Sequence, residues 1–292
     1  MDVWIIFNPI LKALLYVASF GSVGSFLFSL HFGKQLTEKQ QVYCDYLAHR
    51  STLIGAVTSL VMILSVAGNL GGDLASVIDL LMLQLALESK TGVGYSTAFA
   101  GFAVMLIAHN LKPNNKRIGL IIGSFAVFFS FTMSGHSQVG SVLTQSLLMV
   151  HLLGIAFWLG ALLPFRCICL QPDTSNLGGL AKRFGVLAMG YVGLLLVAGL
   201  GYAYLLLGDI TLIFTTLYGN VLLTKIVLVG VLLSLAALNK FKLVPSLEIK
   251  PSQAVRRFQS SVQFEIALAL VILTASSLLT TSLTLPMGVS SN

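Results

Sequence analysis

The stretch SVLTQSLLMVHLLGIAFWLGALLPF, residues 141–165, runs for 25 residues without a Lys, Arg, Asp or Glu. About 20 apolar residues in an α-helix are enough to cross the hydrocarbon core of a bilayer. The stretch lacks the period-two alternation of a membrane β-strand, and a helix satisfies its own backbone hydrogen bonds in lipid. The stretch therefore predicts a transmembrane helix.

The composition of the whole chain excludes a water-soluble globule. Of its 292 residues, 56% are hydrophobic and 9% are charged, and the mean hydropathy is +0.92, whereas about a quarter of the residues in soluble domains are charged. The formal charge of +7 does not indicate nucleic-acid binding, because the basic residues lie in short loops where they orient membrane helices. Three cysteines are too few for a disulfide framework.

Seven other segments are also apolar and long enough to span, so we expect an all-α polytopic membrane protein with eight transmembrane helices in a single domain. A further apolar stretch, 74–88, carries Asp79, Gln84 and Glu88 and would form about 22 Å of helix against a core of about 30 Å. We expect it to be a short outer surface helix between the second and third spans. The predicted spans are 5–31, 50–69, 93–110, 118–134, 141–165, 184–207, 220–239 and 263–285.

Lys and Arg fall almost entirely in alternate loops. The loops after the first, third, fifth and seventh spans contain 14 of them, and the other loops and both termini contain only Lys90. Cytoplasmic loops carry the excess of Lys and Arg, so we expect both termini on the periplasmic side. Lys12 and Lys225 lie inside spans near their outer ends, and we expect both to snorkel to the interface.

His151 is the only histidine deep within a predicted span. It lies about ten residues into the fifth span, roughly 15 Å below the outer boundary. An imidazole in hydrocarbon needs a partner, a cavity or a metal, so His151 is a candidate functional residue, with a hydrogen bond across the bundle as the structural alternative. Trp158 and Gly154 share its helix face, and Gly154 would let a neighbouring helix approach closely.

Imidazole and thioether ligands together suit copper. Met133 and His136, three residues apart at the outer end of the fourth span, could share an ion on a surface that we expect to be mildly acidic. Cys167 and Cys169 at the inner end of the fifth span could pass a soft metal to the cytoplasm, although two cysteines complete no zinc site. The remaining histidines are expected at the inner face, where they could also release copper: His31, His49 and His109.

Other chemistries find little support in the sequence. The chain has no Walker loop, dinucleotide fingerprint or Gly-x-Ser-x-Gly elbow, so we expect neither an enzyme nor ATP-driven pumping by this chain alone. A proton relay has few candidates, because no Asp or Glu is expected in mid-membrane. Glu265 is predicted near the inner end of the eighth span, as a partner of Arg256 or Arg257.

Five patches of the second half form a specific pattern when taken together. They are SGHS at 134–137, HLLGIAFWLGALLPF at 151–165, RF at 183–184, YGNVLLTKIVLVGVLLSLAALNKFKLVPSL at 218–247, and RRFQSSVQFEIALALVILTASSLL at 256–279. As a set they resemble the copper resistance protein D (CopD) family of bacterial inner-membrane proteins. The first half is similar to the family in its pattern of spans and surface helix.

The resemblance implies copper handling at the bacterial inner membrane. Members are associated with moving copper across that membrane, often beside a periplasmic copper-binding partner of the CopC type, which is encoded with them or fused to them. We expect no fused partner here. Some relatives carry a further histidine three residues before the position of His151, where this chain has Leu148. A paired-histidine site on this helix is therefore not expected.

The resulting functional prediction is copper uptake from the periplasm to the cytoplasm. Copper would enter at Met133 and His136, be held at His151, and leave near the histidines and cysteines of the inner face. Two alternatives remain open. One is a membrane b-type cytochrome with haem between inner-face histidines, although haem is the less expected cofactor because His151 has no second imidazole at its depth. The other is a non-transporting membrane partner of a periplasmic copper chaperone.

Overall fold

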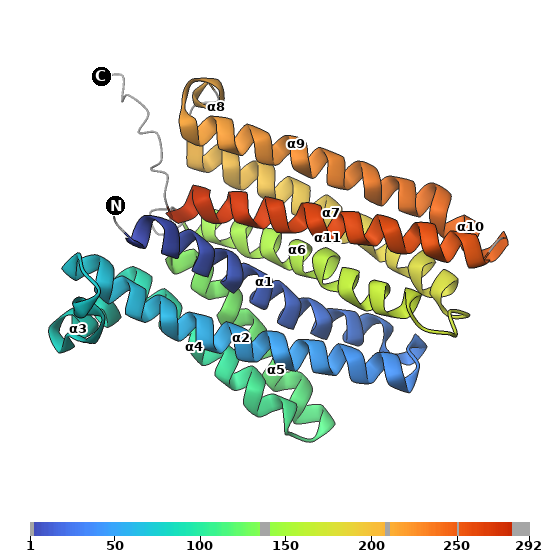
Figure 1. Ribbon diagram of the computed structural model, residues 1–292, viewed down its shortest axis with the longest axis horizontal. Helices are drawn as coiled ribbons and strands as arrows, with labels where there is room; N and C mark the ends of the chain where they lie inside the picture. Colours follow the sequence, from blue (N-terminus) through green and yellow to red (C-terminus); the bar gives the residue numbers. More distant parts are fainter. Residues whose placement is uncertain (1–2, 135–140, 208–210, 250, 282–292) are drawn as a thin grey trace.

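The computed structural model describes residues 3–134, 141–207, 211–249 and 251–281, which fold into helices with no β-strand among them (Figure 1). Eight of the helices are long and apolar enough to cross a membrane, which confirms the predicted number. They are α1 (Val3–Phe32), α2 (Glu38–Gly71), α4 (Lys90–His109), α5 (Pro113–Ser130), α6 (Val142–Cys169), α7 (Leu177–Leu207), α9 (Leu217–Leu238) and α11 (Pro251–Thr281).

Two of these helices begin well before the apolar segments that predict them. Helix α2 starts at Glu38 rather than near residue 50, and α11 starts at Pro251 rather than near residue 263. At α2 the start is fixed by a capping box, in which Thr37 and Gln40 exchange hydrogen bonds with each other's backbone amides. Hydropathy detects the part of a helix that lies in lipid, so it misses the polar first turns of a helix that continues beyond it.

The predicted surface helix is divided into two short elements. Gly72 ends α2 with a positive φ of 81°, a conformation that glycine adopts without steric cost. The chain then forms a 3₁₀ turn, η2 (Ala75–Ile78), and restarts at Asp79, whose carboxylate caps α3 (Leu80–Glu88). Hydrogen bonds from the Ser76 hydroxyl and amide lower the pKa of the Asp73 carboxyl. The position of this segment on a membrane surface remains a prediction.

Helices α1 and α6 lie at the centre of the bundle. Helix α1 packs against α2, α6 and α11, while α6 packs against α1, α7 and α11, and α4 and α5 form a pair beside α2 (Figure 1). Gly24 of α1 and Gly160 of α6 face each other so closely that a Cβ on either would collide with the backbone of the other. Small residues let two membrane helices approach in this way, so this contact joins the two halves of the chain.

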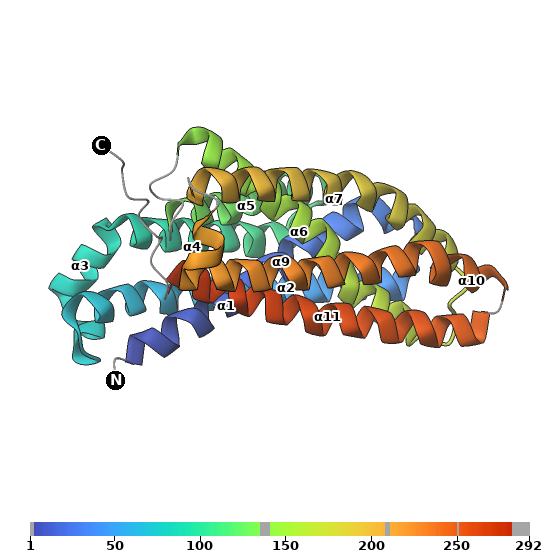
Figure 2. The same cartoon turned by 90° about the horizontal axis from the view of Figure 1, so that it is seen from above.

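Helix α9 lies at the edge of the bundle. It packs along α11, as both views show, and hardly touches α7 (Figure 2). A short helix, α8 (Leu212–Thr215), precedes it. At its other end the helix continues through a π-helical turn, η5 (Asn239–Leu243), into α10 (Val244–Ile249). The sparse packing between α7 and α9 leaves room for two cavities on this side of the molecule.

Aromatic side chains fill much of the core between α1, α6 and α7. Phe157 of α6 stacks on Tyr191 of α7 with ring centroids 3.9 Å apart, and Phe184 stacks on the same phenylalanine at 5.3 Å. Stacked aromatic pairs add to the stabilisation from burial. The helices that frame the cavities are thus held by a rigid core on their inner side.

Candidate functional site

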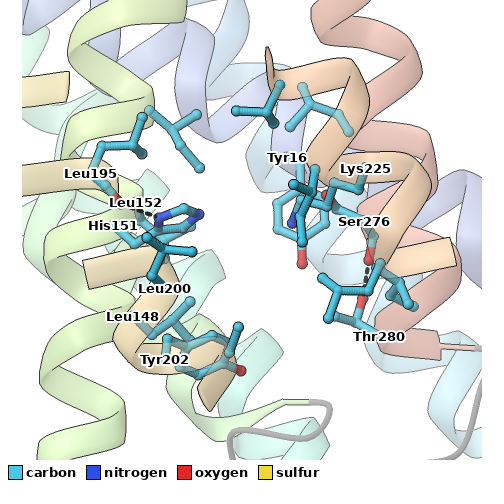
Figure 3. Close-up of a pocket in the computed structure, with 18 of the residues that line it drawn as sticks. Tyr16, Leu148, His151, Leu152, Leu195, Leu200, Tyr202, Lys225, Ser276 and Thr280 are labelled. Atoms are coloured by element: carbon cyan, nitrogen blue, oxygen red, sulfur yellow. Dashed lines mark hydrogen bonds between the residues drawn. The ribbon is translucent and has the colours of Figure 1, made fainter. Parts of the chain in front are cut away.

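The larger cavity, of about 370 Å³, lies between α1, α6, α7, α9 and α11 (Figure 3). Most of its lining is apolar, and no acidic side chain of the described residues is part of it. We call it the His151 cavity. Its polar and ionisable lining residues are Lys12, Tyr16, Ser134, His151, Tyr202, Tyr218, Lys225, Ser276 and Thr280.

His151 reaches this cavity from α6, with its ring fixed by a backbone contact to α7. Its Nδ1 lies 3.0 Å from the carbonyl oxygen of Leu195. A carbonyl oxygen only accepts hydrogen bonds, so Nδ1 carries the hydrogen and donates. In the neutral imidazole the lone pair is then on Nε2, and Figure 3 shows the ring projecting into the cavity, opposite Tyr16 and Lys225. Metal-binding histidines typically have this arrangement, with one nitrogen tied to a carbonyl and the other presented to the metal.

Two glycines allow α6 and α7 to bring this contact together. A Cβ at Gly199, one helical turn after Leu195, would lie 2.7 Å from both Nδ1 and Cε1 of His151, so the ring occupies the space of the absent side chain. A Cβ at Gly154 would lie 2.8 Å from the Cβ of Leu195. The prediction that Gly154 lets a neighbouring helix approach closely is therefore confirmed.

Lys12 does not snorkel to an interface as predicted. Its side chain is only 2% exposed, and its Nζ donates a 2.7 Å hydrogen bond to the hydroxyl of Ser134. The ammonium group also lies 4.9 Å and 5.1 Å from the ring centroids of Phe131 and Tyr95. Aromatic faces attract a cation, so Ser134, η3 and α4 supply partners for Lys12 inside the bundle.

Lys225 is half-buried and lines the His151 cavity, and its snorkelling to the interface remains a prediction. It reaches the cavity from α9, on the side opposite His151 (Figure 3). Lys12 and Lys225 thus place two amino groups at the cavity that holds the imidazole. The sequence showed both lysines inside spans, and only the packing of α9 on α11 shows that they share a cavity.

The predicted outer copper site is only partly described. Met133 lies in η3 (Phe131–Met133) and packs toward α4, where its sulfur lies 4.0 Å from the hydroxyl of Thr97. Its neighbours Phe131 and Ser134 line the His151 cavity, and Met133 does not. His136 lies outside the described residues, so the pairing of Met133 with His136 remains a prediction.

The predicted inner-face histidines do not form one group. His31 donates from Nδ1 to the carbonyl of Leu27 at 2.8 Å, which leaves Nε2 to accept a 3.3 Å hydrogen bond from the hydroxyl of Tyr191. His49 and His109 instead pair with each other, with ring centroids 5.3 Å apart and ring planes at 84°. The buried Nε2 of His109 has no hydrogen-bond partner in the described part of the chain. Copper binding at His31 would therefore have to displace Tyr191.

The cysteines lie at the inner end of α6 and in α2. Cys169 is buried, Cys167 is half-buried, and Cys44 of α2 is buried nearby. Gln171 directs its amide at the sulfur of Cys167 over 3.9 Å. Within the described ranges, no three His, Cys, Asp or Glu side chains are grouped so that they could hold a metal ion. A copper site among the described residues would therefore take at most two ligands of these four types.

The sequence-based prediction for Glu265 is also wrong. It does not pair with Arg256 or Arg257, because α11 begins at Pro251 and carries those arginines more than two turns away from it. Its carboxylate accepts hydrogen bonds from the indole of Trp158, at 3.3 Å, and from the amide of Asn239. The side chain is 3% exposed. An earlier start of α11, which the Pro251 position could have signalled, would have placed Glu265 near mid-helix.

Glu265 lines a second cavity, of about 230 Å³, which we call the Glu265 cavity. It is framed by α6, α7, α9, η5 and α11. A buried apolar cluster of Trp158, Leu195, Leu232 and Ile272 lies between the two cavities, with Leu195 lining one and Trp158 the other. Because Trp158 follows His151 by seven residues, the two cavities differ in depth by about 10 Å.

Comparison with known families covers both halves of the chain. The family model of copper resistance protein D matches residues 178–279, and that of the copper resistance protein D-like N-terminal domain matches residues 1–146. Neither the curated proteins nor the solved structures contain a match. The members of the copper resistance protein D family are membrane copper-resistance proteins and are not a known enzyme family. The second match extends the resemblance to the first half of the chain, where it rested only on the pattern of spans and the surface helix. We conclude that the chain belongs to the copper resistance protein D family.

Proposed function

We propose that this protein carries copper across the bacterial inner membrane, from the periplasm to the cytoplasm, and that the ion is held in the His151 cavity on its way. The proposal rests on family membership and above all on the Nε2 of His151. The ring is held at Nδ1 by the carbonyl of Leu195, and this leaves Nε2 directed into the cavity as a neutral imidazole ligand. An intramembrane imidazole is costly and is retained where it serves a function.

The charge of the cavity determines the form in which copper can enter. Lys12 and Lys225 line it, no described acidic side chain does, and like charges repel a bare cation. We therefore propose that copper arrives with an anionic ligand, which faces the lysines while the ion binds Nε2 of His151. The volume of about 370 Å³ is several times the roughly 30 Å³ that one water occupies in the liquid. It can hold the ion together with a small ligand.

A single protein ligand, the Nε2 of His151, suits an ion in transit. A site with a single protein ligand holds copper weakly, and exchange between ligands can then carry the ion onward. Met133 and His136 are proposed to receive copper at the outer end of the bundle, from a periplasmic copper-binding protein of the CopC type. Beyond the apolar cluster, the proposed release sites are Cys167 and Cys169 or the His49 and His109 pair.

The experiment is copper uptake into proteoliposomes that contain the purified protein and a trapped Cu(I) chelator. His151→Ala and His151→Gln should both abolish uptake, whereas Ser146→Ala, an exposed position on the same helix, should leave it unchanged. Glutamine can still donate a hydrogen bond to Leu195 but offers copper no imidazole. Hydrogen bonds in membranes average only about 0.6 kcal/mol, so both variants should be as abundant as the parent protein.

Each alternative function predicts a different result for the purified protein. Uptake at the parent rate by both His151 variants would contradict an interior site at His151. A parent protein that binds a periplasmic copper protein but moves no copper would be a scaffold. A purified protein with a strong Soret absorption band would be a cytochrome.

A further inference from the structure

Glu265 is a carboxylate near the middle of a membrane-spanning helix with no cation bonded to it in the described part of the chain. Its two oxygens accept from neutral donors only, the indole of Trp158 and the amide of Asn239. In a membrane, a buried acidic side chain marks a functional site by default, and proton relays are a recurring use. The proposed passage of copper through the His151 cavity does not use this group.

The lining of the Glu265 cavity contains one other ionisable side chain among the described residues. The part of the Glu265 cavity formed by α6, α7 and α9 is lined by apolar residues, Trp158 and Gly185. Lys240 of η5 lines the same cavity, and its ammonium group donates a 3.2 Å hydrogen bond to the carbonyl of Gly185. Lys240 is thus held by α7, and Glu265 can gain or lose a proton without breaking an ion pair.

Asn239 can bond to both protonation states of Glu265. Its amide nitrogen donates to the carboxylate, and its buried Oδ1 has no hydrogen-bond partner among the described residues. If Glu265 takes up a proton, rotation of the amide would bring Oδ1 into position to accept from the carboxylic acid. An unpaired buried oxygen is expensive, so the second state would satisfy an atom that the first leaves unsatisfied. Asn239 also begins the π-helical turn η5, a feature frequent at functional sites.

We propose that Glu265, Asn239 and Trp158 form an intramembrane proton-binding site, and that proton exchange there is coupled to the movement of copper. In the exchange, a proton from water in the Glu265 cavity adds to a carboxylate oxygen, and it returns to water when the site empties. The coupling rests on the proposed function, whereas the proton site does not. Trp158 provides a mechanical connection, because it bonds to Glu265 and lies on α6, the helix that carries His151.

The site contains its own reporter, because Trp158 is one of only two tryptophans in the chain. In a Trp4→Phe background, the fluorescence of Trp158 should titrate with pH in copper-free proteoliposomes. Glu265→Gln should abolish this titration, Glu265→Asp should shift its midpoint, and Glu248→Gln, an exposed carboxylate in α10, should leave it unchanged. In the chain with both tryptophans, infrared difference spectra should show a carboxylic acid C=O band that appears as pH falls and is missing in Glu265→Gln.

Proton coupling is then tested with a pH-sensitive dye inside copper-transporting proteoliposomes. Copper uptake should change the internal pH, and Glu265→Gln should abolish that change. The proton site would be overturned if the Trp158 titration survived in Glu265→Gln. It would also be overturned if the parent protein showed neither the titration nor the infrared band. Copper uptake without proton movement would overturn the coupling alone and leave the proposed function standing. Absence of copper uptake by the parent would overturn the proposed function, and the fluorescence and infrared results would still decide the proton site.

Discussion

The carbonyl oxygen of Leu195 determines which nitrogen of His151 faces the cavity. Without that contact the imidazole could turn, and either tautomer could be present. With it, Nδ1 is occupied by a backbone acceptor and Nε2 is left for a ligand. The space for the ring comes from Gly199, which has no side chain where the imidazole lies. At the scale of single residues, a backbone oxygen and a missing methyl group therefore prepare the site.

Gly199→Ala should weaken Cu(I) binding by about 10- to 100-fold, the range typical for residues that orient a metal ligand. The new Cβ would lie 2.7 Å from Nδ1 and Cε1, so the ring must turn away from Leu195. Competition against a Cu(I) chelator in detergent measures the affinity. Gly193→Ala is the matched control, because a Cβ at that position on the same helix meets nothing within 4 Å. Equal affinities for the two variants would show that Gly199 does not position the ring.

Helix α6 connects the features of the site that come from distant parts of the chain. Along one face it presents His151 to the larger cavity, Gly154 to α7, and Trp158 to Glu265. On another face Gly160 meets Gly24 of α1. The sequence indicated the first face, because i, i+3 and i+7 positions share a side of a helix. The second face depends on which helix lies opposite, and the pattern along one helix does not contain that information.

The remaining differences between sequence and structure arise at helix ends and from partners that the sequence does not identify. The apolar spans were predictable because lipid requires a minimum length of apolar helix. Hydropathy did not show the early start of α11, for which Pro251 is the one signal in the sequence, and this start moves Glu265 from a predicted ion pair with Arg256 or Arg257 to a site with Trp158 and Asn239. Lys12 was misplaced for a related reason, since its partner Ser134 lies more than a hundred residues further along the chain.

At the scale of the whole molecule, the two cavities lie one beyond the other on the side where α7 and α9 hardly touch. One contains the imidazole and two lysines, the other contains the carboxyl group, and the apolar cluster around Leu232 lies between them. A carrier needs a barrier that opens to one side at a time. In the proposed carrier, relative movement of α9 and α7 would open this cluster, which contains Leu195 of α7 and Leu232 of α9.

The orientation of the molecule is a separate prediction, based on the 14 Lys and Arg in alternate loops against one in the others. In a chain whose native cysteines are replaced by serine, Leu87→Cys in α3 should react with a membrane-impermeant maleimide in intact spheroplasts. Asn115→Cys, exposed at the other end of the bundle, should react only after permeabilisation. The reverse pattern would place His151 nearer the cytoplasm and invert the direction of uptake.

The most direct test of the account is the X-ray absorption spectrum of the protein loaded with one equivalent of Cu(I). The account predicts imidazole scattering around the copper in the parent and in Gly193→Ala. In His151→Ala that scattering should decrease, together with the affinity for the ion. If His151→Ala binds Cu(I) with the parent's affinity and spectrum, the ion is held elsewhere and the His151 cavity is not the copper site.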